Sequence, residues 1–193
     1  MSANLFGTAE SDKRILVVDF GAQYAQLIAR RVRESNVYSE IVSHELDAEN
    51  FAELKPSGII FSGGPASVNV EGAPKIDPAI YELGVPILGI CYGAQLIAQQ
   101  NGGSVEGNEK GEYGRTVVNV NESGILLSGV ETSTQQVWMS HFDSITSPPE
   151  GAKVTASSDG SPVAVFEEPE KGLFGVQFHP AVQHTPGGHE LSR

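Results

Sequence analysis

The sequence has 193 residues, a length that suits one domain with a full hydrophobic core. Its 24 acidic and 12 basic side chains give a formal net charge of −12. Such a surface would repel phosphate backbones and anionic lipids, which excludes nucleic acids and membrane surfaces as expected partners. The single cysteine, Cys91, excludes an internal disulfide, and without a signal peptide or a membrane-spanning run we expect a cytoplasmic protein.

The first part of the chain alternates short apolar runs with amphipathic or capped segments, with Asp47 and Asp77 as the expected N-caps of two short helices. Residues 1–13 are polar and are interpreted as an N-terminal tail, and residues 14–193 as the domain itself. Short apolar runs are typical of strands buried on both faces, and their alternation with helices predicts an open, mainly parallel α/β sheet with helices on both faces. The expected strands are 14–20, 38–42, 58–62 and 85–90, and the expected helices are 24–32, 47–54, 79–83 and 93–100.

The pattern changes beyond Gly102, where turn residues separate short apolar runs and little helix is expected. With no helical crossover between them, these runs are predicted to be extra strands that pair antiparallel or extend the edge of the sheet. The expected strands are 116–120, 136–139, 163–166 and 173–177.

The segment from Gly89 to Gly93 places Cys91 between an apolar strand and a helix. Glycines on both sides allow a sharp turn and a close approach of the backbone, as in the nucleophile elbow of hydrolases. The positive end of the following helix would stabilise a thiolate there. The alternative is a buried structural cysteine, because most lone cysteines are inert core residues.

A thiol nucleophile needs a base, and His179 is the candidate because it follows an expected buried strand. The ends of parallel strands are where the sites of α/β proteins gather. The alternative is a strand-end histidine whose polar atoms the backbone satisfies. His184 and His189 match no familiar metal-ligand spacing, and no second cysteine completes a zinc site, so no metal is expected.

The loop Ser62-Gly-Gly-Pro65 follows another expected strand, so its backbone amides and the amide of Tyr92 could hold an oxyanion. A tight turn or a phosphate loop is the alternative. The sequence has neither the P-loop motif nor the dinucleotide-binding glycine motif, which argues against nucleotide binding by this domain.

Three segments together carry a resemblance to a known family: Gly89-Ile-Cys-Tyr-Gly-Ala-Gln95, Ser62-Gly-Gly-Pro65 and Gly175-Val-Gln-Phe-His-Pro180. They resemble the class I, triad-type glutamine amidotransferases, whose fold is flavodoxin-like with added antiparallel strands. Segments 17–33 and 137–141 resemble more narrowly the amidotransferase domain of bacterial GMP synthetases, particularly the actinobacterial forms.

The resemblance implies that the domain hydrolyses glutamine to glutamate and ammonia. Cys91 would attack the side-chain amide and form a thioester, and His179 would carry the thiol proton to the leaving ammonia. The amides of Gly64 and Tyr92 would hold the oxyanion. The positions that match the family's glutamine pocket are Gly63, Gln95, Ser140, His141 and Asp143.

The resemblance also implies partners. In that family, ammonia passes to a separate synthetase domain that uses ATP and Mg to aminate XMP. This sequence has no segment like the pyrophosphatase loop of that domain and no dimerisation domain, so we expect no cofactor in this domain and a synthetase partner in cis or in trans. The full enzyme is expected to be a homodimer, and this chain alone is expected not to make GMP.

Two positions depart from the family pattern. Ala181 stands two residues after His179, where the family has a glutamate that orients and stabilises the imidazole. Phe142 stands where the family has glycine, so its bulk is expected to intrude on the glutamine pocket, with backbone strain if its φ is positive. A carboxylate from Glu190 or Asp143 could take the missing role.

These departures leave a second hypothesis, a catalytically silent module of the amidotransferase fold that docks on or regulates a synthetase. A third is the amidotransferase component of an anthranilate synthase or a carbamoyl-phosphate synthetase, against which the segment Val137-Trp-Met-Ser-His141 argues. Glutamine hydrolysis is the favoured hypothesis, with its rate lowered by Ala181 and Phe142.

Overall fold

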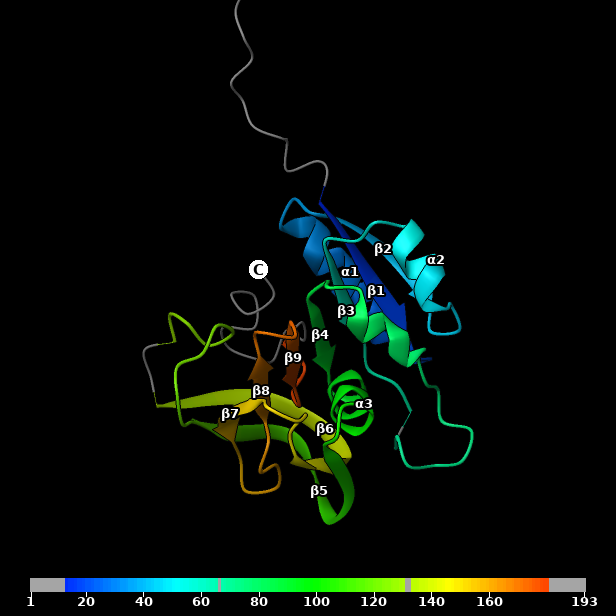
Figure 1. Ribbon diagram of the computed structural model, residues 1–193. Helices are drawn as coiled ribbons and strands as arrows, with labels where there is room; N and C mark the ends of the chain where they lie inside the picture. Colours follow the sequence, from blue (N-terminus) through cyan, green and yellow to red (C-terminus); the bar gives the residue numbers. More distant parts are fainter. Residues whose placement is uncertain (1–12, 66, 131–132, 181–193) are drawn as a thin grey trace, which may run out of the picture.

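The computed structural model describes residues 13–65, 67–130 and 133–180, whose strands form one nine-stranded sheet (Figure 1). The strand order is β2-β1-β3-β4-β9-β8-β7-β5-β6. Of the expected N-terminal tail, only Lys13 lies inside the described residues. The elements are β1 (Arg14–Asp19), α1 (Tyr24–Glu34), β2 (Tyr38–Ser43), α2 (Ala48–Glu53), β3 (Gly58–Phe61), the 3-10 helix η2 (Pro78–Glu82), β4 (Ile87–Ile90), α3 (Tyr92–Gln100), β5 (Ser104–Val120), β6 (Thr134–Ser147), β7 (Lys153–Ser157), β8 (Val165–Glu168) and β9 (Leu173–Val176).

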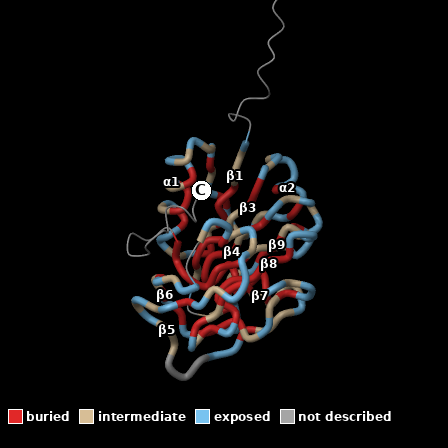
Figure 2. Tube along the Cα trace, turned by 90° about the vertical axis from the view of Figure 1, so that its left-hand side faces the viewer, coloured by how far each residue is buried: buried red, intermediate tan, exposed pale blue. Residues whose placement is uncertain are grey.

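Five neighbouring strands, β2, β1, β3, β4 and β9, are parallel to one another. In β1, Leu16 and Val18 pack into one core with residues of α2, η2 and α3, whereas Val17 packs into a second core with residues of α1. The buried residues accordingly concentrate along the central strands (Figure 2). This arrangement confirms the predicted α/β sheet with helices on both faces.

Aspartate caps begin two of the helices, as the sequence predicts. Asp47 accepts a hydrogen bond from the backbone N–H of Asn50 at 2.9 Å, at the start of α2. Asp77 accepts from the N–H of Ala79 at 3.0 Å and from that of Ala48 at 2.9 Å, so it joins the starts of η2 and α2. The segment after Asp77 is a short 3-10 helix, where the sequence predicts only a short helix.

The remaining strands, β8, β7, β5 and β6, continue the sheet from β9 in antiparallel pairing. The hairpin of β5 and β6 is much longer than the two short strands expected there. β7 falls where no strand is predicted, because Lys153–Ser157 lacks a long apolar run. The expectation of extra antiparallel strands is confirmed, but their lengths are not.

The prediction for residues 173–177 is wrong in one respect. β9 lies in the interior of the sheet and pairs parallel with β4 as well as antiparallel with β8. It reaches β8 through a short turn, whereas its pairing with β4 joins segments far apart in the sequence, which chain order does not reveal. This placement brings the residues that follow β9 to the same sheet edge as the residues that follow β4.

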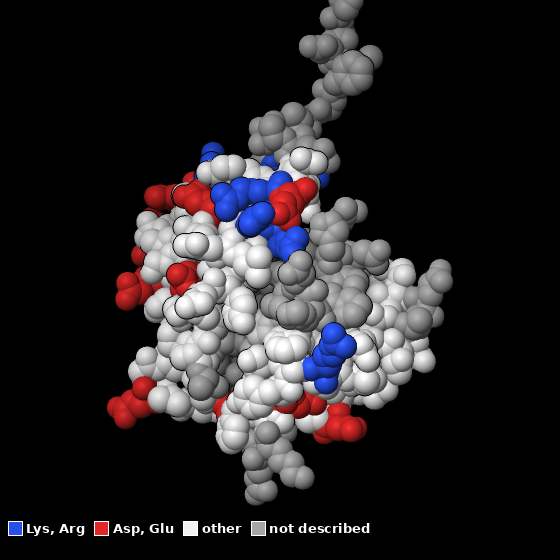
Figure 3. Space-filling model, turned by 180° about the vertical axis from the view of Figure 1, so that it is seen from behind, with Lys and Arg blue, Asp and Glu red and all other residues white. Residues whose placement is uncertain are grey.

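Charged side chains lie on the outer face of α1. Seen from behind, Lys and Arg side chains gather mainly in the upper part of the molecule (Figure 3). On α1, Arg30 and Arg31 form ion pairs with Glu34 at 3.1 and 3.0 Å. No helix in the described ranges is both long enough and apolar enough to cross a membrane.

Candidate active site

Cys91 lies at the turn from β4 into α3, at the carboxyl end of the parallel strands. Its φ of 53° and ψ of −109° are rare for a residue with a side chain and mark a strained position. Its N–H donates to the carbonyl of Val176 at 2.8 Å, and its carbonyl accepts from the N–H of Gln95 at 3.1 Å. The strand end, sharp turn and helix start together have the geometry of a nucleophile elbow.

Close packing around this turn requires glycine at three positions. A Cβ at Gly93 would lie 2.4 Å from the carbonyl oxygen of Phe61, and a Cβ at Gly89 would lie 2.5 Å from a backbone nitrogen of α3. A Cβ at Gly64 would lie 2.6 Å from the ring of Tyr92. Glycine therefore lets α3 and the loop after β3 approach the sulfur with their backbones.

A cavity of about 240 Å³ opens beside Cys91 and brings together every predicted site residue except Asp143. No Asp, Glu, Lys or Arg lines it, and within the described ranges no group of three or more His, Cys, Asp or Glu is placed to hold a metal ion. The lining residues are Ala22, Tyr24, Gly63, Gly64, Pro65, Cys91, Tyr92, Gln95, Tyr113, Ser140, His141, Phe142 and His179.

His179 follows β9 and contacts two other elements, β6 and α1. Its N–H donates to the carbonyl of Trp138 on β6 at 3.1 Å. Its ring packs against the ring of Tyr24 on α1, with centroids 4.8 Å apart and an interplanar angle of 34°. A Cβ at Gly63 would lie 3.7 Å from its Cε1 atom. The imidazole is therefore positioned by rigid elements beside the cavity that Cys91 also lines.

The thiol and the imidazole are both uncharged at neutral pH. Burial raises the pKa of Cys91 to about 12, although hydrogen bonds from the Tyr92 amide and the Gln177 side chain act in the opposite direction. Burial, together with the charge of His141, lowers the pKa of His179 to about 4. A neutral imidazole can accept a proton, so this pair can begin a reaction as acid and base.

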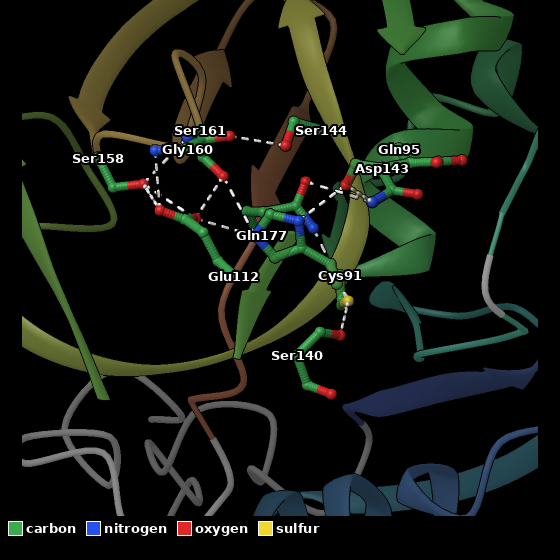
Figure 4. Close-up of polar contacts among 11 residues, drawn as sticks. Cys91, Gln95, Glu112, Ser140, Asp143, Ser144, Ser158, Gly160, Ser161 and Gln177 are labelled. Carbon is green, nitrogen blue, oxygen red and sulfur yellow. Dashed lines mark hydrogen bonds and ion pairs between the residues drawn. The ribbon is translucent and has the colours of Figure 1, made fainter. Parts of the chain in front are cut away.

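One wall of the cavity is the backbone of β6. The thiol of Cys91 faces the carbonyl oxygen of Ser140 at 3.7 Å (Figure 4). The carbonyl oxygen of Asp143 accepts from Nε2 of Gln95 at 2.9 Å and lies 2.8 Å from Nδ1 of His141. Backbone carbonyls of β6 therefore fix the thiol, the helix side chain and the histidine relative to one another.

Asp143 is the one predicted pocket residue that does not line the cavity. Its side chain is buried and accepts a hydrogen bond from the hydroxyl of Ser67, outside the lining. The part of Asp143 that meets the site is its carbonyl group, which holds Gln95 and His141. Direct contact between its carboxylate and a substrate stays a prediction.

Phe142 lines the cavity, as its departure from the family pattern suggests, and the residue is 46% exposed. It lies within β6 with a negative φ, so the backbone strain that a positive φ would bring does not arise. Ala181, His184, His189 and Glu190 lie outside the described residues.

Sequence reasoning did not single out Gln177 and Glu112. Gln177 is completely buried and donates from Nε2 to the sulfur of Cys91 at 3.7 Å. Glu112 lies 3.1 Å from Nε2 of His141, measured from its Oε2 atom. The position of Gln177 inside an otherwise apolar run is the sequence feature that could have indicated its role. No sequence feature indicates Glu112, because only the fold brings it to the site.

The fold and the site define an α/β protein with a Cys–His pair at the carboxyl edge of its parallel strands. The family model of the class-I glutamine amidotransferases matches residues 16–193. The chain belongs to this family, as the sequence predicts.

Within this family, the chain is similar in sequence to curated GMP synthases such as the following two. The glutamine-hydrolysing GMP synthase of Nocardia farcinica is 53% identical over 183 residues, which are 95% of this chain and 34% of that protein. The enzyme of the same name from Mycobacterium leprae is 52% identical over 190 residues, 98% of this chain and 36% of that protein. The chain thus spans about a third of the length of these relatives, and the predicted likeness to the GMP synthetase branch is confirmed.

Solved structures agree with this likeness. A protein from Thermoplasma acidophilum, assigned to GMP synthase as one of its subunits, superposes with a TM-score of 0.83 at 33% identity, covering 93% of this chain and 89% of its own. A glutamine amidotransferase from Thermotoga maritima superposes with a TM-score of 0.70 at 22% identity, covering 88% of this chain and 76% of its own. The second likeness concerns the fold alone.

Proposed function

We propose that this domain hydrolyses glutamine to glutamate and ammonia, with Cys91 as the nucleophile and His179 as the general acid and base. The observation that carries the proposal is the strained turn of Cys91, which aims its thiol into a cavity that His179 also lines. A strained backbone persists where function requires it, and a structural core cysteine would not need one.

In the proposed reaction, the sulfur of Cys91 attacks the side-chain amide carbon of glutamine, and the thiol proton passes to His179. The oxyanion that forms lies near the amides of Gly64 and Tyr92. Its collapse breaks the carbon–nitrogen bond, and His179 returns the proton to the leaving ammonia. Water then attacks the thioester, releasing glutamate and restoring the thiol.

The neutral resting pair suits this sequence. Because the thiol keeps its proton and the imidazole lacks one at neutral pH, the proton moves only as the sulfur attacks. A substrate-coupled transfer limits reaction of the thiol with other electrophiles between turnovers. Gly63, Gln95, Ser140 and His141 line the remainder of the cavity, where the amino and carboxylate ends of glutamine are proposed to bind.

The names of the relatives extend this proposal. We infer that the ammonia serves the amination of XMP to GMP by a separate synthetase domain, which uses ATP and Mg, in the same polypeptide or on another. Support comes from two GMP synthases that share more than half of their residues with this chain over the matched region. A cytoplasmic, homodimeric full enzyme belongs to the same proposal.

The test is ammonia release from glutamine, measured for this chain alone and with a synthetase domain added. The parent is expected to release ammonia and Cys91→Ser is expected to lose all of it. Modification of the lone thiol by a glutamine-analogue electrophile should block the same activity. If the folded parent releases none in either condition and is not labelled, the domain is the silent docking module instead.

Ala181 supplies a matched comparison. Because alanine cannot orient the imidazole as the family's glutamate does, Ala181→Glu is expected to raise turnover above the parent. Turnover that stays at the parent's level would show that His179 is oriented by other contacts, of which the Tyr24 ring and the Trp138 carbonyl are the two described above.

A further inference from the structure

Gln177 is a fully buried polar side chain that does not line the cavity, yet it touches the reacting atom. It directly follows β9, and its Nε2 donates to the sulfur of Cys91 at 3.7 Å (Figure 4). Its Oε1 accepts from Nε2 of Gln95 at 3.4 Å. A buried side-chain amide is stable only with partners at both ends, and both partners here belong to the site.

The contacts fix which end of the Gln177 amide faces the sulfur. The carbonyl oxygen of Asp143 can only accept, and Gln95 directs its Nε2 toward it at 2.9 Å. The same Nε2 group therefore meets Gln177, whose oxygen must turn toward Gln95 and whose nitrogen must turn toward Cys91. The opposite rotamer would place an oxygen against the sulfur and a donor against a donor.

The Asp143 carbonyl is itself held by a second donor. Nδ1 of His141 lies 2.8 Å from that oxygen, and Nε2 of His141 lies 3.1 Å from the carboxylate of Glu112. Both ring nitrogens thus face oxygen atoms, and Nε2 of the buried ring pairs with the carboxylate of Glu112. This pair anchors the polar chain that ends at Gln177.

Glu112 is well suited to this role because its carboxylate is fully satisfied. It accepts hydrogen bonds from the hydroxyls of Ser158 and Ser161 and from the N–H of Gly160. Burial acts to raise the pKa of Glu112, but the hydrogen bonds from His141 and these groups outweigh it and lower the pKa to about 2. The anchor is therefore anionic throughout the neutral range.

We propose that Gln177 is a catalytic residue whose amide N–H stabilises the Cys91 thiolate, and that Gln95, His141 and Glu112 are positioning residues that hold this amide with its donor toward the sulfur. The proposal rests on the proposed function, in which the thiol gives its proton to His179. Negative charge then appears on a sulfur already faced by an N–H group, and such charge-assisted hydrogen bonds are the strong ones.

The test uses the reaction of the lone cysteine with iodoacetamide as a function of pH. Because Cys91 is the single cysteine of the chain, the alkylation rate reports on that thiol alone. The titratable side chains that share its cavity are Tyr24, Tyr92, Tyr113, His141 and His179, and all of them stay unchanged in the variants. Iodoacetamide is small and uncharged, so glutamine recognition does not enter the measurement.

Gln177→Met keeps the size of the side chain and removes the donor. The alkylation profile of this variant is expected to shift to higher pH, with a rate at neutral pH about tenfold or more below the parent, since a hydrogen bond to a charged group is lost. Gln95→Met should shift the profile in the same direction by a smaller amount, because the donor on Gln177 remains but is free to turn. Gln136→Met, at an exposed position of β6, is the matched control and should leave the profile unchanged.

A parent-like profile in folded Gln177→Met would overturn the proposal. Should that variant fail to fold, the parent gives an independent answer by NMR. The chemical shifts of the Gln177 side-chain amide protons are expected to change as the thiol ionises or is alkylated, whereas those of Gln136 should not. Gln177 chemical shifts that do not change would also overturn the proposal. Neither readout needs glutamine turnover, so a failure of the proposed activity is distinguishable from a failure of this role.

Discussion

The parallel half of the sheet (β2, β1, β3, β4 and β9) and the antiparallel half (β8, β7, β5 and β6) meet at the cavity but supply different things. The parallel half supplies the strained backbone at Cys91 and a set of glycines that permit close packing. The antiparallel half supplies a polar wall, in which the Ser140 carbonyl faces the thiol, and His141 lies between the Asp143 carbonyl and the Glu112 carboxylate. One half shapes the backbone around Cys91, and the other fixes charged and hydrogen-bonding groups behind it.

The two halves also differ in how the sequence determines their geometry. The elbow is built from residues 89–93, neighbours in sequence, so its geometry follows from local chemistry. The wall joins Glu112 to His141 and to the turn that contains Ser158 and Ser161, and only tertiary pairing brings these segments together. Substitutions in the two halves should therefore fail in different ways, by steric clash in the first and by unpaired charge in the second.

The largest effect is expected in the wall. Glu112→Ala removes the carboxylate partner of the buried His141, so the free energy of unfolding should fall by about 3–5 kcal/mol at pH 7. Because the folded pKa of Glu112 lies below its ordinary value of 4.5, its contribution is present above pH 4.5 and is lost as pH falls toward 2. Urea unfolding at pH 7 and at pH 3 should show a smaller difference from the parent at pH 3.

Glu122→Ala is the matched control for that measurement. Glu122 is exposed and pairs with Lys153 at 3.1 Å at the surface, so its loss should change the free energy of unfolding by about 0–1 kcal/mol. Equal effects of the two substitutions would show that the Glu112–His141 pair is no more important to stability than a surface pair.

The next effect is expected at the elbow. In Gly93→Ala the new Cβ would lie 2.4 Å from the carbonyl oxygen of Phe61, so α3 must shift away from β3 at a cost of about 3 kcal/mol. Thermal unfolding and alkylation of Cys91 should both change, since α3 begins beside the sulfur. Gly107→Ala, whose Cβ would make only ordinary contacts at 3.7 Å, is the control; a stable Gly93→Ala with unaltered alkylation would contradict the steric account.

The same contrast explains how much of the fold was predictable. In the parallel half, apolar runs and aspartate caps such as Asp47 and Asp77 placed the strands and helices to within a few residues. In the antiparallel half, β5 and β6 carry polar residues on an exposed face for much of their length, so apolar patterning captured only part of each. The interior position of β9 depends on pairing with β4 across most of the chain, which local patterns do not encode.

The residues of the site were likewise predictable only where local sequence determines their geometry. Cys91 and the glycine loop could be predicted because a sharp turn requires particular residues in immediate sequence. His179 was predicted as the base from its place at the end of a buried strand, and the resemblance supported the same pairing with Cys91. Gln177 and Glu112 were not singled out, because a hydrogen bond to a distant sulfur or histidine leaves no periodic trace in the sequence.

A third prediction concerns His179 and tests whether its imidazole is buried without charge. Its pKa falls from an ordinary 6.5 to about 4 in the folded state, so only the unfolded chain binds its proton between these values. The folded state should therefore lose stability as pH falls from 6.5 toward 4, and His179→Phe should lose about 1–2 kcal/mol less than the parent between pH 7 and pH 5. The protonation of Glu112 changes little between pH 7 and pH 5, since its ordinary and folded pKa values both lie below pH 5. Parallel stability profiles for the two proteins would argue for a solvated imidazole.

The smallest effect is expected where the two halves face each other across the cavity, at Phe142. Phe142→Gly removes a half-exposed ring from the lining, so the KM for glutamine should fall a few-fold while kcat changes little, because the ring does not hold the thiol or the base. Glycine within a strand should also lower the free energy of unfolding by about 0.5–1 kcal/mol. Val117→Gly, at an exposed position of β5 outside the lining, separates the two effects, since it should show the loss of stability alone. An unchanged KM in Phe142→Gly would mean that the ring leaves room for the substrate.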